Sequence, residues 1–358
     1  MKKIFCIFTL LLITFLSACT NTIVLTDISQ PIYQRSIGGT TANIPLAGTY
    51  TGTAPTHIQA RVVVHGTSKE VLTWTLLTYE SISGGNWSGN LSSVPQGAWY
   101  DVQVRESNAT SIYANGSNAW GVGIIIAIWG QSNSLWLAES SYKNYVWGGS
   151  DYAANSLLKQ YGGKSCSCMN DCVGTNFSPI TGSWVTPTAN GVITLGNALV
   201  AELNIPIGFH VFALGGSSLL SNNTLCGSPG WYWNGQQYAL AKANLQSVTG
   251  TAEYIVWWQG WSDGYASVAQ ADYYAGLKVV VNNIASDFPG AKVLYVYSDN
   301  ASTNVKKAFL KAIANGYGYA GADATGISYP NSADIGPASA TTIGRRLATS
   351  ILAMQSVH

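Results

Sequence analysis

The strongest structural signal is an apolar run, Gly123-Ile124-Ile125-Ile126-Ala127-Ile128-Trp129, followed directly by Gly130-Gln131-Ser132-Asn133. A run of β-branched residues that stops at a glycine predicts a buried strand ending in a tight turn. Such a turn places the Ser132 hydroxyl at the carboxyl edge of a parallel sheet, where open α/β folds bind their ligands.

Downstream of this stretch, short apolar segments alternate with segments of helical periodicity. This alternation predicts a parallel sheet covered by helices on both faces. Residues 142–186 do not follow it and are predicted to form a long insertion. The expected strands are 207–214, 254–258 and 292–297, and the expected helices are 195–203, 273–287, 305–315 and 343–354.

Upstream, residues 31–118 have the pattern of an all-β domain. The segments 58–64, 71–77 and 99–105 alternate or are continuously apolar, and turn-forming residues separate them. They predict a small antiparallel β-sandwich, followed by a linker at 107–118. The expected organisation is a processed signal at 1–18, a tether and sandwich at 19–118, and an α/β domain at 119–358.

The N-terminus reads as a processing signal. Lys2 and Lys3 precede an apolar stretch, and Leu16-Ser17-Ala18-Cys19 resembles a bacterial lipobox. This resemblance implies an exported cell-envelope protein, lipid-anchored through Cys19 at the outer membrane or cell surface. Ordinary secretion with an unmodified Cys19 is the alternative. No later segment approaches the roughly 20 apolar residues of a membrane span, so only the lipid is expected to touch a membrane.

The mature chain is expected to be nearly neutral. Loss of Lys2 and Lys3 from the 17 basic residues leaves one fewer than the 16 acidic ones. Neutrality argues against nucleic acid as a partner. Charged residues make up only 9% of the chain, while Gly, Trp and Tyr are abundant, which is typical of exported proteins that face neutral carbohydrate.

Four cysteines remain outside the signal region: Cys166, Cys168, Cys172 and Cys226. In an exported chain they favour two disulfides, with three possible connectivities. Cys166 and Cys168 are too close in sequence to bridge comfortably, so one of them is expected to join Cys226. The alternative is a metal site, supported only by the Cys-x-Cys-x₃-Cys spacing. We expect no metal and no organic cofactor.

Two further strand ends carry unusual residues: Gly215-Gly216-Ser217-Ser218, and Gln259-Gly260-Trp261-Ser262-Asp263 after Trp257-Trp258. Acyl transfer to a serine needs donors that meet the oxyanion. The backbone N–H groups of Ser132 and Gly216 are natural donors, and the Gln259 side-chain amide is a third candidate. The three strand ends together predict Ser132 as a nucleophile beside an oxyanion hole.

With these residues the chain resembles the SGNH hydrolases, specifically carbohydrate esterases of the sialate O-acetylesterase and acetylxylan esterase kind. Their Gly-Gln-Ser-Asn block matches 130–133, and their Gly-Gly-Ser/Thr turn matches 215–217. Their Gln-Gly-Glu-x-Asp block matches 259–263, with Trp261 in place of the Glu. Tyr33-Gln34-Arg35 and the sandwich resemble their N-terminal domain. The resemblance implies a flavodoxin-like three-layer α/β/α domain that removes acetyl groups from sugars.

The last block of the family, Asp-x-x-His, is only half present. Asp334 matches its Asp, but no histidine follows. His57 and His65 lie in the sandwich, His210 lies inside a strand and is predicted to be a core residue, and His358 is at the terminus. Deleting the base of a serine hydrolase costs on the order of 10⁶ in turnover. The sequence leaves open an esterase with an unusual base, a non-catalytic glycan-binding or surface-structural protein, and an acyltransferase on the same fold.

Aromatic residues gather around the three strand ends. Indole faces suit the apolar faces of sugar rings. Trp129 and Trp257 are expected to close the core. The candidate substrate-binding residues are Asn133, Trp231, Trp233, Trp261 and Asp263.

Overall fold

The computed structural model describes residues 21–28, 30–138, 141–142, 145–146, 156–162, 184–220, 236–298, 300, 302–330 and 333–356. The predictions for the signal, Cys19, the four other cysteines, Trp231, Trp233 and His358 lie outside the described residues. No helix in the described ranges is long and apolar enough to cross a membrane.

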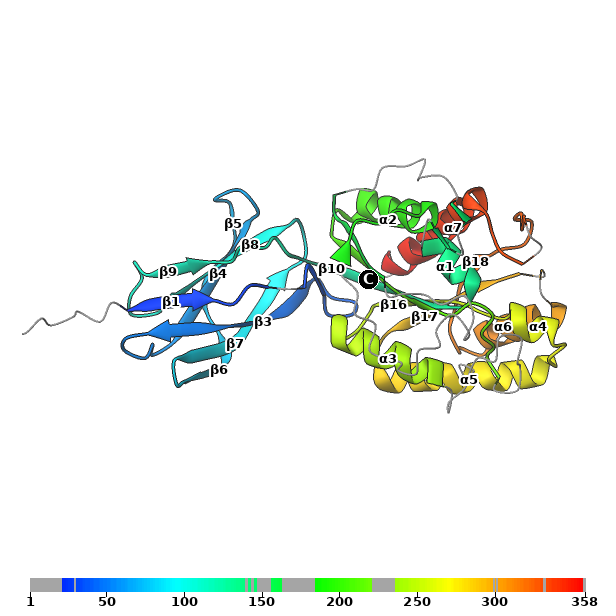
Figure 1. Cartoon of the computed structure of the whole chain (residues 1–358), viewed down its shortest axis with the longest axis horizontal. Helices are drawn as coiled ribbons and strands as arrows, with labels where there is room; N and C mark the ends of the chain where they lie inside the picture. The colour runs from blue at the N-terminus through cyan, green and yellow to red at the C-terminus, as the bar shows by residue number, and fades with distance from the viewer. Residues whose placement is uncertain are drawn as a thin grey trace, which may run out of the picture.

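The N-terminal part is a sandwich of two four-stranded antiparallel sheets (Figure 1). One sheet has the order β1 (Thr22–Leu25), β3 (Thr41–Thr51), β7 (Asn86–Pro95), β6 (Thr78–Ser83). The other has the order β5 (Glu70–Leu76), β4 (Ile58–Val64), β8 (Tyr100–Glu106), β9 (Tyr113–Asn115). Alternate side chains meet between the sheets, where Ile44, Val62 and Val102 are fully buried in one core.

The C-terminal part is built on a mostly parallel sheet. Its order is β14 (Trp184–Val185), β13 (Leu158–Gly162), β15 (Ile207–Ala213), β10 (Gly121–Gly130), β16 (Tyr254–Trp258), β17 (Lys292–Tyr297) and β18 (Tyr319–Asp323). The short β2 (Ile32–Gln34) pairs with the start of β10, and β14 is an antiparallel edge strand. Separately, β11 (Ser141–Tyr142) pairs with β12 (Tyr145–Val146).

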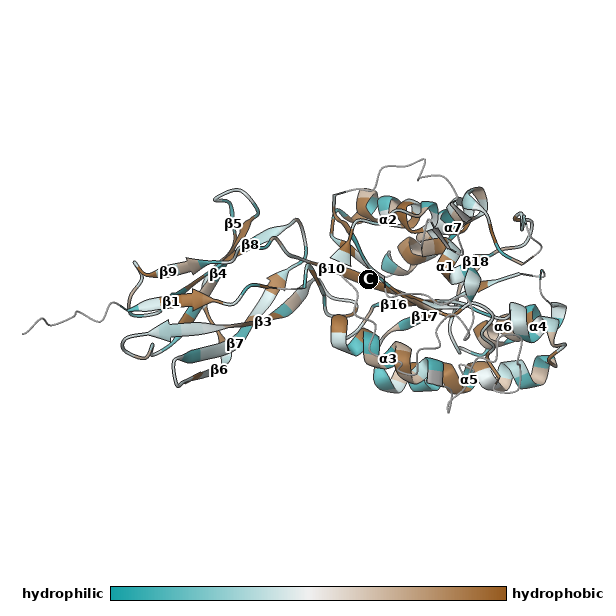
Figure 2. Ribbon diagram, in the orientation of Figure 1, coloured by the Kyte–Doolittle hydropathy of each residue, from teal (hydrophilic) through white to brown (hydrophobic). Residues whose placement is uncertain are grey.

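Helices cover both faces of this sheet, with α1 (Ser132–Ala138), α2 (Asn190–Leu203) and α7 (Pro337–Gln355) on one. The other face carries α3 (Gln236–Val248), α5 (Gln270–Asp287) and α6 (Thr303–Ala314), and the short α4 (Trp261–Tyr265) follows β16. Ile126 packs into the first core and Ile125 into the second, because successive strand residues face opposite sides. Figure 2 shows these central strands as mainly hydrophobic. The predicted three-layer α/β/α domain with a preceding β-sandwich is confirmed.

The sequence pattern misjudged two segments. The stretch 142–186, predicted to be an insertion, contains β13, a strand of the main sheet. Its sequence Leu-Lys-Gln-Tyr-Gly is short and half polar, so it carries no apolar run to mark it. The stretch 107–118, predicted to be a linker, contains β9, which pairs with β8.

Candidate active site

The turn after β10 presents Ser132. Gly130 ends the strand with φ +145°, and a Cβ there would lie 2.1 Å from the Trp258 carbonyl oxygen, so only glycine fits. The Gln131 N–H donates to the same carbonyl at 3.0 Å. Ser132 then begins α1 as a half-buried residue at the carboxyl edge of the sheet.

The side chain of Gln131 braces this turn against the end of β16. Its Oε1 accepts hydrogen bonds from the backbone N–H groups of Gly260 at 3.2 Å and Trp261 at 3.1 Å. The Ser262 N–H lies at 3.5 Å from the same oxygen. The first and third strand-end motifs are therefore joined through one buried amide.

Gln259 and Asp263 join the third motif to the second. The Gln259 Nε2 donates to the Ser217 carbonyl at 3.1 Å and to the Asp263 carboxylate at 2.5 Å. The Asp263 carboxylate also accepts from the backbone N–H groups of Leu219 (2.8 Å) and Leu220 (3.2 Å). Burial raises the pKa of Asp263, and the hydrogen bonds it accepts oppose that shift. This fully buried carboxylate thus fixes the loop after β15.

Two backbone N–H groups lie at neighbouring strand ends, that of Ser132 after β10 and that of Gly216 in the loop after β15, which pairs with β10. Gly216 is half-buried with φ +69°. Across the described ranges, neither its N–H nor that of Ser132 donates a hydrogen bond. Both are thus available for an oxyanion. By contrast, both amide hydrogens of Gln259 already have acceptors, so we assign Gln259 a positioning role instead of the third donor expected from the sequence.

Asn133 holds the segment that contains Asp334. Its Nδ2 donates to the Ala333 carbonyl at 3.0 Å, and its Oδ1 accepts from the Ile335 N–H at 3.0 Å. Asn133 is only 3% exposed. One side chain thus binds the backbone on both sides of the half-buried Asp334 and holds this segment beside the first turn of α1. Asn133 is thus a positioning residue for the Asp334 segment, and its predicted contact with substrate stays a prediction.

We expect Asn133→Ala to lower the free energy of unfolding by about 2 kcal/mol, because it leaves two backbone groups without partners. The Ile335 amide should also exchange faster with deuterium, which hydrogen-exchange mass spectrometry can measure. Asn133→Asp is the matched variant, since it accepts from Ile335 but cannot donate to Ala333. An unchanged Ile335 exchange rate in Asn133→Ala would contradict the clamp.

His210 is a core residue, as its position inside a strand predicts. It is fully buried in β15, its Nε2 lies 2.6 Å from the Asn244 Oδ1, and its ring stacks on Tyr161 at 6.0 Å. Burial lowers the pKa of His210 to about 4. It contacts α3 in the interior and does not serve Ser132.

This buried histidine should make stability depend on pH. Below about pH 6.5 the unfolded chain protonates His210 while the folded chain does not, so stability is lost as the pH falls from about 6.5 to 4. The loss should approach about 3 kcal/mol at pH 4. Urea unfolding at pH 7 and pH 4 should show a smaller difference for His210→Gln than for the wild type. Equal differences in the two proteins would rule out this origin.

The other two described histidines, His57 and His65, also lie away from Ser132. His57 Nδ1 lies 2.9 Å from Glu80, and His65 Nδ1 lies 2.6 Å from Asp101, both within the sandwich. The last described turn of α7 is at the opposite edge of the sheet from Ser132, where Gln355 contacts residues at the start of β16. The structure therefore brings none of the described histidines to Ser132.

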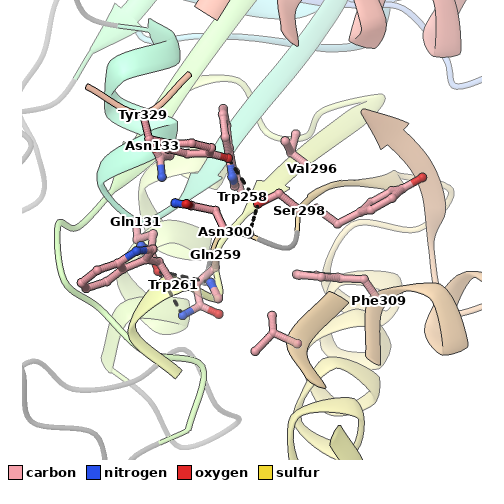
Figure 3. Close-up of a pocket in the computed structure, with 13 residues that line it drawn as sticks. Gln131, Asn133, Trp258, Gln259, Trp261, Val296, Ser298, Asn300, Phe309 and Tyr329 are labelled. Carbon is pink, nitrogen blue, oxygen red and sulfur yellow. Dashed lines mark hydrogen bonds between the residues drawn. The ribbon is translucent and has the colours of Figure 1, made fainter. Parts of the chain in front are cut away.

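A small pocket adjoins the serine turn (Figure 3). Gln131 and Asn133, the neighbours of Ser132, form part of its wall, and Trp261 lies beside them. Trp261 stacks on Tyr265 at 5.5 Å. Sequence reasoning missed another part of the wall, where the Tyr329 hydroxyl lies 3.2 Å from Ser298 Oγ. The position of Ser298 directly after the predicted strand 292–297 was the signal that could have found it.

The other residues that the sequence analysis singled out, Trp129, Trp257 and Asp263, are all buried. Trp129 and Trp257 are buried in the core, as expected. Asp263 is fully buried, so its carboxylate serves the protein interior and not a sugar. Within the part of the chain that the structure describes, no three His, Cys, Asp or Glu side chains gather to hold a metal ion.

The fold is shared with a solved carbohydrate esterase structure. A carbohydrate acetylesterase from Xanthomonas citri superimposes with a TM-score of 0.56 at 16% identity, covering 93% of this chain and 76% of that one. Weaker likenesses are a protein from Arabidopsis thaliana (TM-score 0.46, 16% identity, 64% and 97% coverage) and a family two carbohydrate esterase from Cellvibrio japonicus (0.38, 11%, 94% and 99%). No protein-family model and no curated protein matches the sequence.

Proposed function

We propose that the protein recognises O-acetylated carbohydrate at the Ser132 turn and removes the acetyl group through Ser132. The observation that carries this proposal is the convergence of one half-buried serine and two unoccupied backbone N–H groups at a single sheet edge. Its support from the comparisons is the fold shared with a carbohydrate acetylesterase.

In this reaction the Ser132 oxygen forms a bond to the acetyl carbonyl carbon. The N–H groups of Ser132 and Gly216 stabilise the oxyanion. The serine proton passes to Asp334 and then to the departing sugar oxygen as the ester bond breaks. Water hydrolyses the acetyl-serine by the same route and releases acetate. A carboxylate is a weaker base than an imidazole, so turnover should be far slower than in a histidine-assisted hydrolase.

A second candidate is a glycan-binding protein without turnover. The favouring observation is that the described histidines are engaged away from Ser132. Both candidates require the same pocket and differ only in whether the ester is cleaved.

Acetate release from an aryl acetate and from acetylated xylan separates them. For the esterase, Ser132→Ala should fall to the background rate, while Asp334→Asn should fall at least tenfold with sugar binding retained. Rates that equal background in all three proteins, with saturable binding of the acetylated glycan, would establish the binding protein. If the wild type neither releases acetate nor binds the acetylated glycan, neither candidate function applies to the Ser132 pocket.

We also propose export and lipid anchoring through Cys19, supported by the lipobox-like sequence 16–19. Cys19→Ala should move the protein from the membrane to the soluble fraction, and mass spectrometry of the wild type should show the diacylglyceryl mass on the first residue. A wild-type protein found only in the soluble fraction would contradict the anchor.

A further inference from the structure

We propose that a groove between the sandwich and the α/β/α domain binds an acidic sugar unit of a glycan. The groove has a volume of about 570 Å³, within the usual range for small-ligand sites. Its walls come from the segments that precede β2 and β10, from β13 and β14, and from the last residues of α3. It thus lies toward the amino ends of the strands, while Ser132 lies at the carboxyl ends, so this site is separate from the proposed esterase site.

One wall is aromatic and firmly held. Tyr161 and Trp184 are register partners in β13 and β14, and their ring centroids are 5.6 Å apart at 62°. Tyr161 is backed by the stacked ring of His210. Trp184 lies over Gly208, where an added Cβ would be 3.4 Å from the indole. A fixed, partly exposed indole offers an apolar face to the C–H face of a sugar ring.

Among the described residues that line the groove, Lys159 carries the one positive charge, and none of them carries a counter-charge. No carboxylate of the described ranges pairs with the Lys159 ammonium group. The ammonium lies 5.9 Å from the ring of Trp99. A lone cation in a concave site attracts an anion, and a sugar carboxylate supplies one.

The polar side chains of the groove are arranged to accept hydrogen bonds. Gln30 donates its amide to the Ile32 carbonyl at 2.6 Å, and Asn118 donates its amide to the Ile28 carbonyl at 3.2 Å. These bonds orient the two amides and leave their oxygens as acceptors for sugar hydroxyls. A cation, two acceptors and an aromatic wall together match a uronic or sialic acid better than a neutral sugar.

The test is calorimetric titration of the mature protein with glucuronate, N-acetylneuraminate and glucose. We expect saturable binding of at least one acidic sugar, weakened by salt, and glucose binding at least fivefold more weakly. Lys159→Gln should reduce the affinity for the acidic sugar about fivefold or more, while the exposed Lys69→Gln should leave it unchanged. Trp184→Ala should weaken both kinds of sugar.

Equal affinity for glucose and the acidic sugars, or an unchanged affinity in Lys159→Gln, would overturn the proposal, as would no binding at all. Because the readout is binding, it does not depend on Ser132 turnover. Acetate release should be the same in Lys159→Gln and in the wild type. A protein that fails to release acetate but binds glucuronate would contradict the proposed function and leave this inference standing.

Discussion

A histidine introduced next to Asp334 is expected to raise Ser132-dependent acetate release by on the order of 10²- to 10⁴-fold, the usual effect of a positioned general base. The two positions to test are Gly336 and Pro337. They are the first and second residues after Ile335, whose N–H donates to Asn133. The segment that leads into these positions is therefore held against the first turn of α1, which Ser132 begins.

The backbone admits a side chain at both positions. Gly336 caps α7 with φ −96° and ψ 177°, an extended conformation that any residue adopts. Among the residues that the structure describes, a Cβ there would approach the Pro330 ring, at 3.3 Å. Pro337 is the first residue of α7, where proline is favourable but not required.

The gain should appear in one of the two variants and should vanish when Ser132→Ala is added. It should also develop as the pH rises through about 6.5, because the base must be neutral to accept a proton. Thr349→His, exposed further along α7, is the matched control and should show no gain. Folded Gly336→His and Pro337→His proteins that both stay at the wild-type rate would show that Ser132 is not poised to react, which favours the glycan-binding candidate.

The sequence predicted the fold where the core itself makes a continuous pattern. The strands β10, β15, β16 and β17 are apolar runs because both of their faces are covered by helices. The helix α3 escaped prediction because its sequence is mostly polar, and β13 because it is short. Local pattern carries no signal for such elements when tertiary contacts determine them.

The sequence likewise predicted one part of the candidate site and not another. Strand ends brought Ser132, Gly216 and Gln259 to one edge, because parallel strands end there together. The roles of the neighbouring residues could not be predicted from the sequence, because they depend on contacts between segments that are far apart in the chain. Asn133 was expected to bind substrate, yet its partners are about 200 positions away in the chain. Sequence spacing cannot predict that one amide side chain will hydrogen-bond to the backbone on both sides of Asp334.

The second large effect is expected at a buried ion pair that joins the two parts of the molecule. Arg35, at the end of β2, donates to Glu253 at 3.0 Å and 2.9 Å, and the two residues are 5% and 1% exposed. Gln96 from the sandwich accepts from Arg35 at 2.6 Å. Gln355 from the end of α7 donates to Glu253 at 2.7 Å. One charged pair thus connects the sandwich, the start of β16 and the last helix.

Arg35→Met should cost about 3–5 kcal/mol of unfolding free energy, because it leaves the Glu253 carboxylate buried without a counter-charge. Urea unfolding should place Arg35→Met and Glu253→Met far below the wild type, and the double variant should cost clearly less than the two single losses combined. The exposed pair Arg61–Glu70, at 3.8 Å, is the control, and breaking it should cost at most about 1 kcal/mol. If Arg35→Met costs no more than Arg61→Met, the pair does not hold the two parts together. If the single losses simply add, Arg35 and Glu253 act independently, and the sandwich is attached through the β2–β10 pairing and its apolar contacts.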